Sequence, residues 1–132
     1  MKVALLDLDG VLITQDPTDP PELYPEAYQV LLHLHSTLQI PLVLVSYNGD
    51  AAYYLKELKI DHFFTHISAE WNKHNDNKFF QLMEVRKLYP ELAPEDFHFF
   101  DDLMSNVRTA RALGMEHTLV DSKYGIRMLD LG

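Results

Sequence analysis

Short apolar runs alternate along the chain with segments of helical period. Each of these runs is largely apolar without a regular alternation of apolar and polar residues, which is typical of strands that are covered on both faces of a parallel sheet. Five such runs occur, at residues 2–6, 42–45, 63–67, 97–100 and 118–120. Their alternation with helices predicts an α/β protein with a three-layer α/β/α, Rossmann-like fold and a central, mostly parallel five-stranded sheet.

The intervening segments carry the signals of amphipathic helices. Pro25 suits the first turn of a helix, and Asp50 is of a residue type that caps one. Gly114 suits the left-handed conformation that ends helices. These signals predict helices over 25–38, after Asp50, over about 77–89 and over about 103–113.

Length and charge limit the classes of function. The chain has 132 residues, which is the size of one domain, so a single domain over 1–132 is expected. Eleven Lys and Arg against 20 Asp and Glu give a net charge of −9. Such a surface repels phosphate backbones and anionic lipid, so general nucleic-acid binding and membrane binding are disfavoured.

Targeting signals are missing from the pattern. The apolar run at the start meets Asp7 after four residues without a signal-peptide cleavage site, and no run approaches the ~20 apolar residues of a membrane span. The chain has no cysteine, which suits a reducing compartment and excludes disulfides. We therefore expect a soluble, cytoplasmic protein.

Polar side chains follow three of the predicted strands at the points where they end. Asp7 follows the first run, Ser46 the second, and Asp101 with Asp102 the fourth. Ligands of open α/β sheets bind in the crevice outside the carboxyl ends of the strands, so these groups are expected to converge. Several carboxylates in one crevice repel one another unless a hard divalent cation binds their oxygens, and Mg²⁺ is the natural candidate.

A second carboxylate on the first strand strengthens this interpretation. The side-chain period of two would point Asp7 and Asp9 the same way, while Gly10 lets the chain turn sharply away. The candidate metal ligands are therefore Asp7, Asp9, Asp101 and Asp102.

Four short motifs resemble those of a known family. Residues 7–12 read Asp-Leu-Asp-Gly-Val-Leu, which resembles the first motif of the haloacid dehalogenase (HAD) superfamily. Ser46 resembles its second motif, a lysine before a helix its third, and Phe-Phe-Asp-Asp at 99–102 its fourth. All four occur in order over nearly the whole chain. The form of the fourth motif and the small size look most like the magnesium-dependent phosphatase branch.

Chemistry assigns roles to the two carboxylates of the first motif. Beside Mg²⁺, Asp7 can attack phosphorus and carry the phosphoryl group as an aspartyl phosphate, which water then hydrolyses. Asp9 is the nearby acid that can protonate the leaving oxygen and then activate water. The resemblance implies that phosphatases and phosphomutases carry an acid at this position, whereas dehalogenases and phosphonatases do not. Phosphate chemistry is therefore favoured over C–Cl or C–P cleavage.

The second motif is predicted to bind the phosphoryl group. The hydroxyl of Ser46 and the backbone N–H groups from Tyr47 to Gly49 would donate to a nonbridging oxygen, and Asn48 can add a donor. A lysine would neutralise both the nucleophile and the phosphate. The candidates are Lys73 and Lys78, and Lys78 is favoured because it opens an apolar helical run with Asp76 or Asn77 as a cap.

Two assignments at the fourth motif stay open. Asp102 can cap the helix from Leu103 and leave Asp101 as the metal ligand, or the roles can be reversed. Asn106 lies four residues after Asp102, so one helical turn can bring it to the site, although a solvated asparagine fits as well.

The places at which members of the family often carry a cap domain are short here. Residues 13–24 and 68–77 number twelve and ten, far below the ~50 at which independent domains begin. The resemblance therefore implies a capless member with an open crevice. Such a crevice would need a macromolecular phosphate, or a pocket completed by a second subunit of an oligomer, to gain specificity.

The function predicted from these observations is a Mg²⁺-dependent phosphatase that hydrolyses phosphate monoesters through an aspartyl phosphate. One alternative is a phosphotransferase that hands the same intermediate to a second substrate. Another is a catalytically silent phosphate-binding or scaffold domain, because a fold does not imply activity. The partner is a phosphorylated substrate whose identity the motifs do not give.

Overall fold

Five parallel strands form the centre of the computed structural model, which describes residues 1–15, 20–70 and 78–132. Their order in the sheet is β3-β2-β1-β4-β5, and every neighbouring pair is parallel. The strands are β1 (Val3–Leu6), β2 (Leu42–Ser46), β3 (His66–Ala69), β4 (Phe97–Asp101) and β5 (Glu116–Leu119). The predicted fold class is confirmed.

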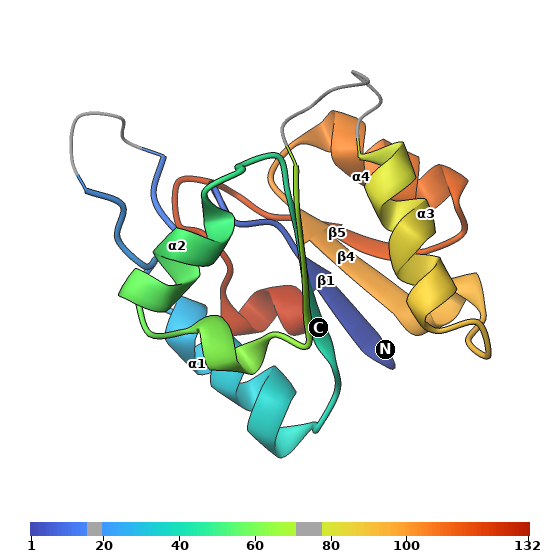
Figure 1. Ribbon diagram of the computed structural model, residues 1–132, viewed down its shortest axis with the longest axis horizontal. Coiled ribbons are helices and arrows are strands. Elements are labelled where there is room, and N and C mark those ends of the chain that lie inside the picture. Colours follow the sequence, from blue (N-terminus) through green and yellow to red (C-terminus); the bar gives the residue numbers. More distant parts are fainter. Residues whose placement is uncertain (16–19, 71–77) are drawn as a thin grey trace.

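Helices cover both faces of this sheet, so the molecule has three layers. Figure 1 shows α1 and α2 on one side of the strands and α3 and α4 on the other. The helices are α1 (Ala27–Leu32), α2 (Ala51–Glu57), α3 (Phe79–Leu88) and α4 (Met104–Ala112). Within the described ranges no inserted cap domain is present, and no helix is long and apolar enough to cross a membrane.

Successive residues of each strand point into different halves of the core. Ala4 and Leu6 of β1 pack in the cluster that includes α1 and α2, whereas Val3 and Leu5 pack in the cluster that includes α3 and α4. All four side chains are at most 1% exposed. Burial on both faces explains why the sequence shows a continuous apolar run instead of an alternating one.

The third strand and the first helix differ from their predicted bounds. The strand was expected over 63–67, but residues Asp61–Phe63 form a 3₁₀ helix and the strand begins at His66. The ring of Phe63 is buried against Tyr28, which lies on α1, so this apolar residue belongs to the core without being in the sheet. The helix expected over 25–38 is α-helical only to Leu32 and continues as a π-helix over His33–Thr37.

The helix ends differ less from the expectation. Asp50 precedes α2 as predicted, but its side chain makes no capping hydrogen bond. Gly114 follows α4 with φ of +81°, as expected for the residue that ends it. The fifth strand begins at Glu116, two residues before its predicted start, because it lies at the edge of the sheet and tolerates polar side chains.

The sheet register brings the polar residues of the motifs to one edge. Leu6 is the partner of Phe100, and the N–H of Asp7 donates to the carbonyl of Phe100 at 3.0 Å. Asp7 therefore lies beside Asp101, although the two residues are 94 positions apart in the sequence. The parallel arrangement alone explains this meeting of distant residues.

A partly buried histidine in β4 makes the stability of the fold sensitive to acid. Burial lowers the pKa of His98 from its ordinary 6.5 to about 4, and the ring stacks on Phe100 with centroids 4.3 Å apart. The unfolded chain thus binds more protons than the folded one between these two values. The stability from neutral His98 is complete above pH 6.5 and is lost as pH falls toward 4.

We expect His98→Gln to weaken this acid sensitivity. Urea unfolding at pH 7 and pH 4.5 should show a smaller drop in the free energy of unfolding for His98→Gln than for the wild type. His66→Gln, at an exposed position of β3, is the control and should follow the wild type. An identical drop in all three proteins would contradict the assignment.

Candidate active site

The ammonium group of Lys78 lies between two carboxylates at the carboxyl ends of the strands. Its Nζ is 2.8 Å from Oδ1 of Asp7 and 2.8 Å from Oδ2 of Asp101. It also donates to the backbone carbonyl of Val45, the last residue but one of β2, at 3.0 Å. Residues from β2, from the end of β1 and from β4 therefore meet at one cation, which is 2% exposed.

The backbone of Lys78 is held in an unusual conformation. Its φ is +68°, in the left-handed region that costs a residue with a side chain about 1–2 kcal/mol. Its N–H donates to the hydroxyl of Tyr47, and its Nζ lies 5.4 Å from the centroid of the Tyr47 ring. Lys78 precedes α3 as its N-cap instead of lying inside the helix. Lys73, Asp76 and Asn77 lie outside the described residues.

Asp101 is enclosed by hydrogen-bond donors. Oδ1 accepts from the N–H of Leu103 at 2.9 Å, and Oδ2 accepts from Nδ2 of Asn106 at 3.2 Å as well as from Lys78. Asp101 is 0% exposed. Of the two adjacent aspartates, Asp101 is therefore the one that accepts the N–H at the start of α4. Asn106 is buried at the site, which agrees with the alternative in which it faces the site and not with a solvated side chain.

Asp102 has an oxygen without a hydrogen bond. Its Oδ2 accepts from Nε2 of Gln15 at 3.2 Å, whereas its buried Oδ1 has no hydrogen-bond partner among the described residues. One carboxylate oxygen from each of Asp7, Asp101 and Asp102 lies within 4.8 Å of the others. Three neighbouring carboxylates, one of which has a buried oxygen without a partner among the described residues, fit a divalent cation such as Mg²⁺.

The electrostatics show an excess of negative charge. Burial raises the pKa of Asp7 to about 8, even though the ammonium of Lys78 opposes the shift. Burial also raises the pKa of Asp102. Burial alone would lower the pKa of Lys78, but the charges of Asp7 and Asp101 outweigh it and raise that pKa. One cation thus faces three carboxylates, and the group requires a proton or a further cation at neutral pH.

The Ser46 side of the site is organised by Asn48. The N–H of Asn48 donates to Oγ of Ser46 at 2.9 Å, and its Nδ2 donates to Oδ2 of Asp9 at 3.2 Å. The backbone N–H and one amide hydrogen of Asn48, which were expected to bind phosphate, are therefore engaged within the protein. The hydroxyl hydrogen of Ser46 remains available to a ligand because its oxygen is the acceptor in this contact.

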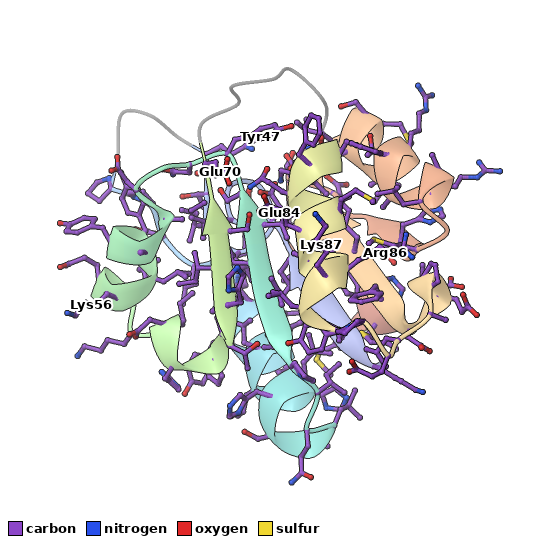
Figure 2. The ribbon with its side chains drawn as sticks, turned by 45° about the vertical axis from the view of Figure 1, so that its right-hand side comes forward. Tyr47, Lys56, Glu70, Glu84, Arg86 and Lys87 are labelled. Atoms are coloured by element: carbon purple, nitrogen blue, oxygen red, sulfur yellow. The ribbon has the colours of Figure 1, made fainter. Side chains whose placement is uncertain are left out.

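These residues surround one cleft with a volume of about 130 Å³. Figure 2 shows Tyr47 at the carboxyl end of β2 and close to the first turn of α3. The lining residues are Asp7, Asp9, Gln15, Ser46, Tyr47, Asn48, Lys78, Asp102, Leu103 and Asn106. Asp9 thus lines the same cleft as the other candidates, but its carboxylate is outside the group of three that lie within 4.8 Å of one another.

Sequence reasoning missed Gln15 and a glutamine behind the site. Nε2 of Gln81 donates to the carbonyl of Ser46 at 2.9 Å and lies 3.2 Å from the carbonyl and 3.1 Å from Oγ of Ser68. Gln81 therefore ties the end of β2 to β3 beneath Ser46. For Gln81, the one signal in the sequence that it lies near the site was its position three residues after Lys78, because residues at that spacing share a helix face.

The fold is that of HAD-like hydrolases of known structure. A haloacid dehalogenase-like hydrolase from Streptococcus pneumoniae superposes with a TM-score of 0.76 at 17% identity, over 99% of this chain and 89% of that one. A HAD-superfamily hydrolase from Geobacter sulfurreducens gives 0.75 at 12% identity, over 90% and 89%. A protein described as a predicted phosphoglycolate phosphatase from Haemophilus somnus gives 0.65 at 19% identity, over 81% and 47%.

No family model and no curated protein matches the chain. At these identities the structural likeness shows the fold alone. The chain therefore has the HAD-like fold, which confirms the resemblance seen in its motifs at the level of architecture.

Replacing Lys78 by methionine is expected to destabilise the fold. The buried carboxylates of Asp7 and Asp101 would lose their shared cation, and breaking a buried ion pair on one side costs about 3 kcal/mol or more. Urea unfolding at pH 7.5 without divalent ions measures this loss. Lys87→Met, at an exposed position of the same helix, is the matched control and should change the free energy of unfolding little. Equal stability of the two variants would contradict the central role of Lys78.

Proposed function

We propose that the protein is a Mg²⁺-dependent phosphatase that hydrolyses phosphate monoesters through an aspartyl phosphate on Asp7. The observation that carries this proposal is the placement of Lys78, which lines one cleft with Asp7, Asp9 and Ser46 and also contacts the buried Asp101. A nucleophile, a phosphate-binding cation, a hydroxyl donor and an acid are thereby within one small volume. The HAD-like fold of the chain supports the same chemistry.

Asp7 and Asp102 are the residues that would hold the metal. Oδ1 of Asp102 has no other partner, whereas both oxygens of Asp101 already accept hydrogen bonds. We therefore assign the direct contact to Asp102 and a positioning role to Asp101, which orients Lys78. When bound, Mg²⁺ would neutralise the excess negative charge and polarise a phosphoryl oxygen.

Asp7 is the nucleophile in this proposal. Lys78 contacts Oδ1, which keeps the carboxylate oriented toward the cleft and favours its ionised form. An oxygen of Asp7 forms a bond to phosphorus while the bond from phosphorus to the ester oxygen breaks. The hydroxyl of Ser46 donates to a nonbridging oxygen. The ammonium of Lys78, whose three N–H groups already reach Asp7, Asp101 and the carbonyl of Val45, balances the charge of the phosphoryl group through its positive charge.

Asp9 moves the protons of both half-reactions. It gives a proton to the leaving ester oxygen in the first step and takes one from the attacking water in the second. The water oxygen then bonds to phosphorus, the bond from phosphorus to Asp7 breaks, and inorganic phosphate leaves. The hydrogen bond from Asn48 holds the Asp9 carboxylate at the cleft.

Asp7→Asn and Asp9→Asn should each lower kcat by at least about 10³-fold while the fold is retained, because the amide is nearly isosteric but neither a nucleophile nor an acid. Release of phosphate from a panel of monoesters with Mg²⁺ measures this loss. Asp61→Asn, at an exposed position outside the cleft, should keep full activity. Wild-type turnover by Asp7→Asn would overturn the covalent mechanism, and transfer to added alcohols would identify a phosphotransferase.

The metal assignment predicts a difference between the two neighbouring aspartates. Asp102→Asn should raise the Mg²⁺ concentration needed for half-maximal thermal stabilisation by about 10-fold or more, because it removes a direct ligand. Asp101→Asn should instead lower the melting temperature of the metal-free protein. The measurement is Tm against Mg²⁺ concentration for both variants. The opposite pattern would exchange the two roles.

A further inference from the structure

The mouth of the cleft has apolar side chains on two sides. Tyr47 follows β2, and Leu103 stands at the start of α4; both line the cleft. Leu103 is 52% exposed, although it follows two acidic residues of the site directly. Its backbone is fixed by the hydrogen bond from its N–H to Asp101, so the position of its side chain relative to the site is well defined.

Two further exposed apolar residues stand at the first positions of the neighbouring helices. Met104, which follows Leu103, is 46% exposed, and Phe79, which follows Lys78, is 39% exposed. Helices α3 and α4 pack against each other, and Figure 1 shows them on the same side of the sheet. A molecule whose phosphate is held at Lys78 would therefore extend over apolar groups.

The charges of the cleft disfavour a second anionic group on that molecule. Among the described lining residues, Lys78 is the one Lys or Arg, and its ammonium already contacts Asp7 and Asp101. A carboxylate or second phosphate on the substrate would find no further cationic side chain among these described residues. Removing an anion from water without a partner is costly, so such substrates would be rejected.

We propose that the substrate is a phosphate monoester of an uncharged, apolar alcohol, and that Leu103 is a specificity-determining residue that contacts this alcohol. The inference rests on the proposed phosphatase activity. The cleft of about 130 Å³ accommodates the phosphate and the first carbons, and Leu103 covers the part that follows. The ester oxygen leaves with a proton, so the products are the free alcohol and inorganic phosphate.

Simple esters test separately whether the alcohol of the substrate is apolar and whether it is uncharged. Hexyl phosphate extends ethyl phosphate by four methylenes without changing the leaving group, and 2-phosphoglycolate replaces the methyl of ethyl phosphate by a carboxylate. We expect kcat/KM to be about tenfold higher for hexyl than for ethyl phosphate, which is less than full burial of the added methylenes would give because the cleft is open. We also expect 2-phosphoglycolate to be the poorest of the three.

Variants of Leu103 test its role. Leu103→Ser should reduce the preference for hexyl over ethyl phosphate to less than about threefold, since it removes most of the contact. The variant should fold, because serine is well tolerated at a helix N-cap. Leu103→Lys should raise kcat/KM for 2-phosphoglycolate, because it adds the missing cation.

The matched control is Leu88→Ser. Leu88 is 47% exposed, close to Leu103, but it lies in the last turn of α3. Its neighbour Lys87 lies far along that helix from Tyr47 in Figure 2. Leu88→Ser should keep the preference of the wild type. An equal loss in both leucine variants would assign the effect to a general change and overturn the proposal.

Binding of inert analogues distinguishes the failure of this inference from that of the proposed function. Hexylphosphonate and ethylphosphonate are titrated calorimetrically into the wild type and Leu103→Ser with Mg²⁺ present. If no ester is hydrolysed but hexylphosphonate binds more tightly in a Leu103-dependent way, the phosphatase proposal fails and the apolar contact stands. If esters are hydrolysed with no preference for hexyl phosphate, or with 2-phosphoglycolate as the best substrate, the inference fails and the phosphatase proposal stands.

Discussion

The site depends on one buried ammonium group. Lys78 neutralises Asp7 and Asp101 at 2.8 Å each and also binds the carbonyl of Val45, so three neighbouring strands of the sheet converge on it. Without this cation the carboxylates would repel one another in a region from which water is largely excluded. Lys78 has an unfavourable left-handed backbone conformation at the point where its side chain enters the site at the carboxyl ends of the strands. The hydrogen bond from its N–H to the hydroxyl of Tyr47 helps to stabilise that conformation.

The excess negative charge that remains links this architecture to chemistry. Burial raises the pKa of Asp7 to about 8, and the charges of Asp101 and Asp102 add to the shift, which the single ammonium of Lys78 does not offset. A divalent cation would correct it and free the carboxylate for attack. The HAD-like fold of the similar structures does not by itself give an activity, because one fold hosts many activities. The arrangement of charges around the cleft is what supports the proposed chemistry.

Much of the fold could be predicted from local patterns. The strands of the buried centre, β1, β2 and β4, were located within a residue at each end, because burial on both faces leaves an uninterrupted apolar run. The edge strands were placed less well. Phe63 is apolar for a reason other than strand formation, and β5 begins with the polar residues Glu116 and His117. Edge strands have one open side, so their apolar signal is weaker.

The sequence by itself determined which polar residues gather at the cleft, since Asp7, Asp9, Ser46 and the pair Asp101 and Asp102 stand at or shortly after the ends of predicted strands. Parallel topology then requires those positions to meet. Only the tertiary structure decided how the groups share their partners. In the folded chain both oxygens of Asp101 accept hydrogen bonds from protein donors, whereas one oxygen of Asp102 accepts none from the described residues. The backbone N–H and the side-chain amide of Asn48 already donate to other protein groups. The tertiary structure also recruited Gln15 and Gln81. Hydrogen bonds between residues far apart in the chain depend on distances and angles of tenths of an ångström, which no spacing along a sequence encodes.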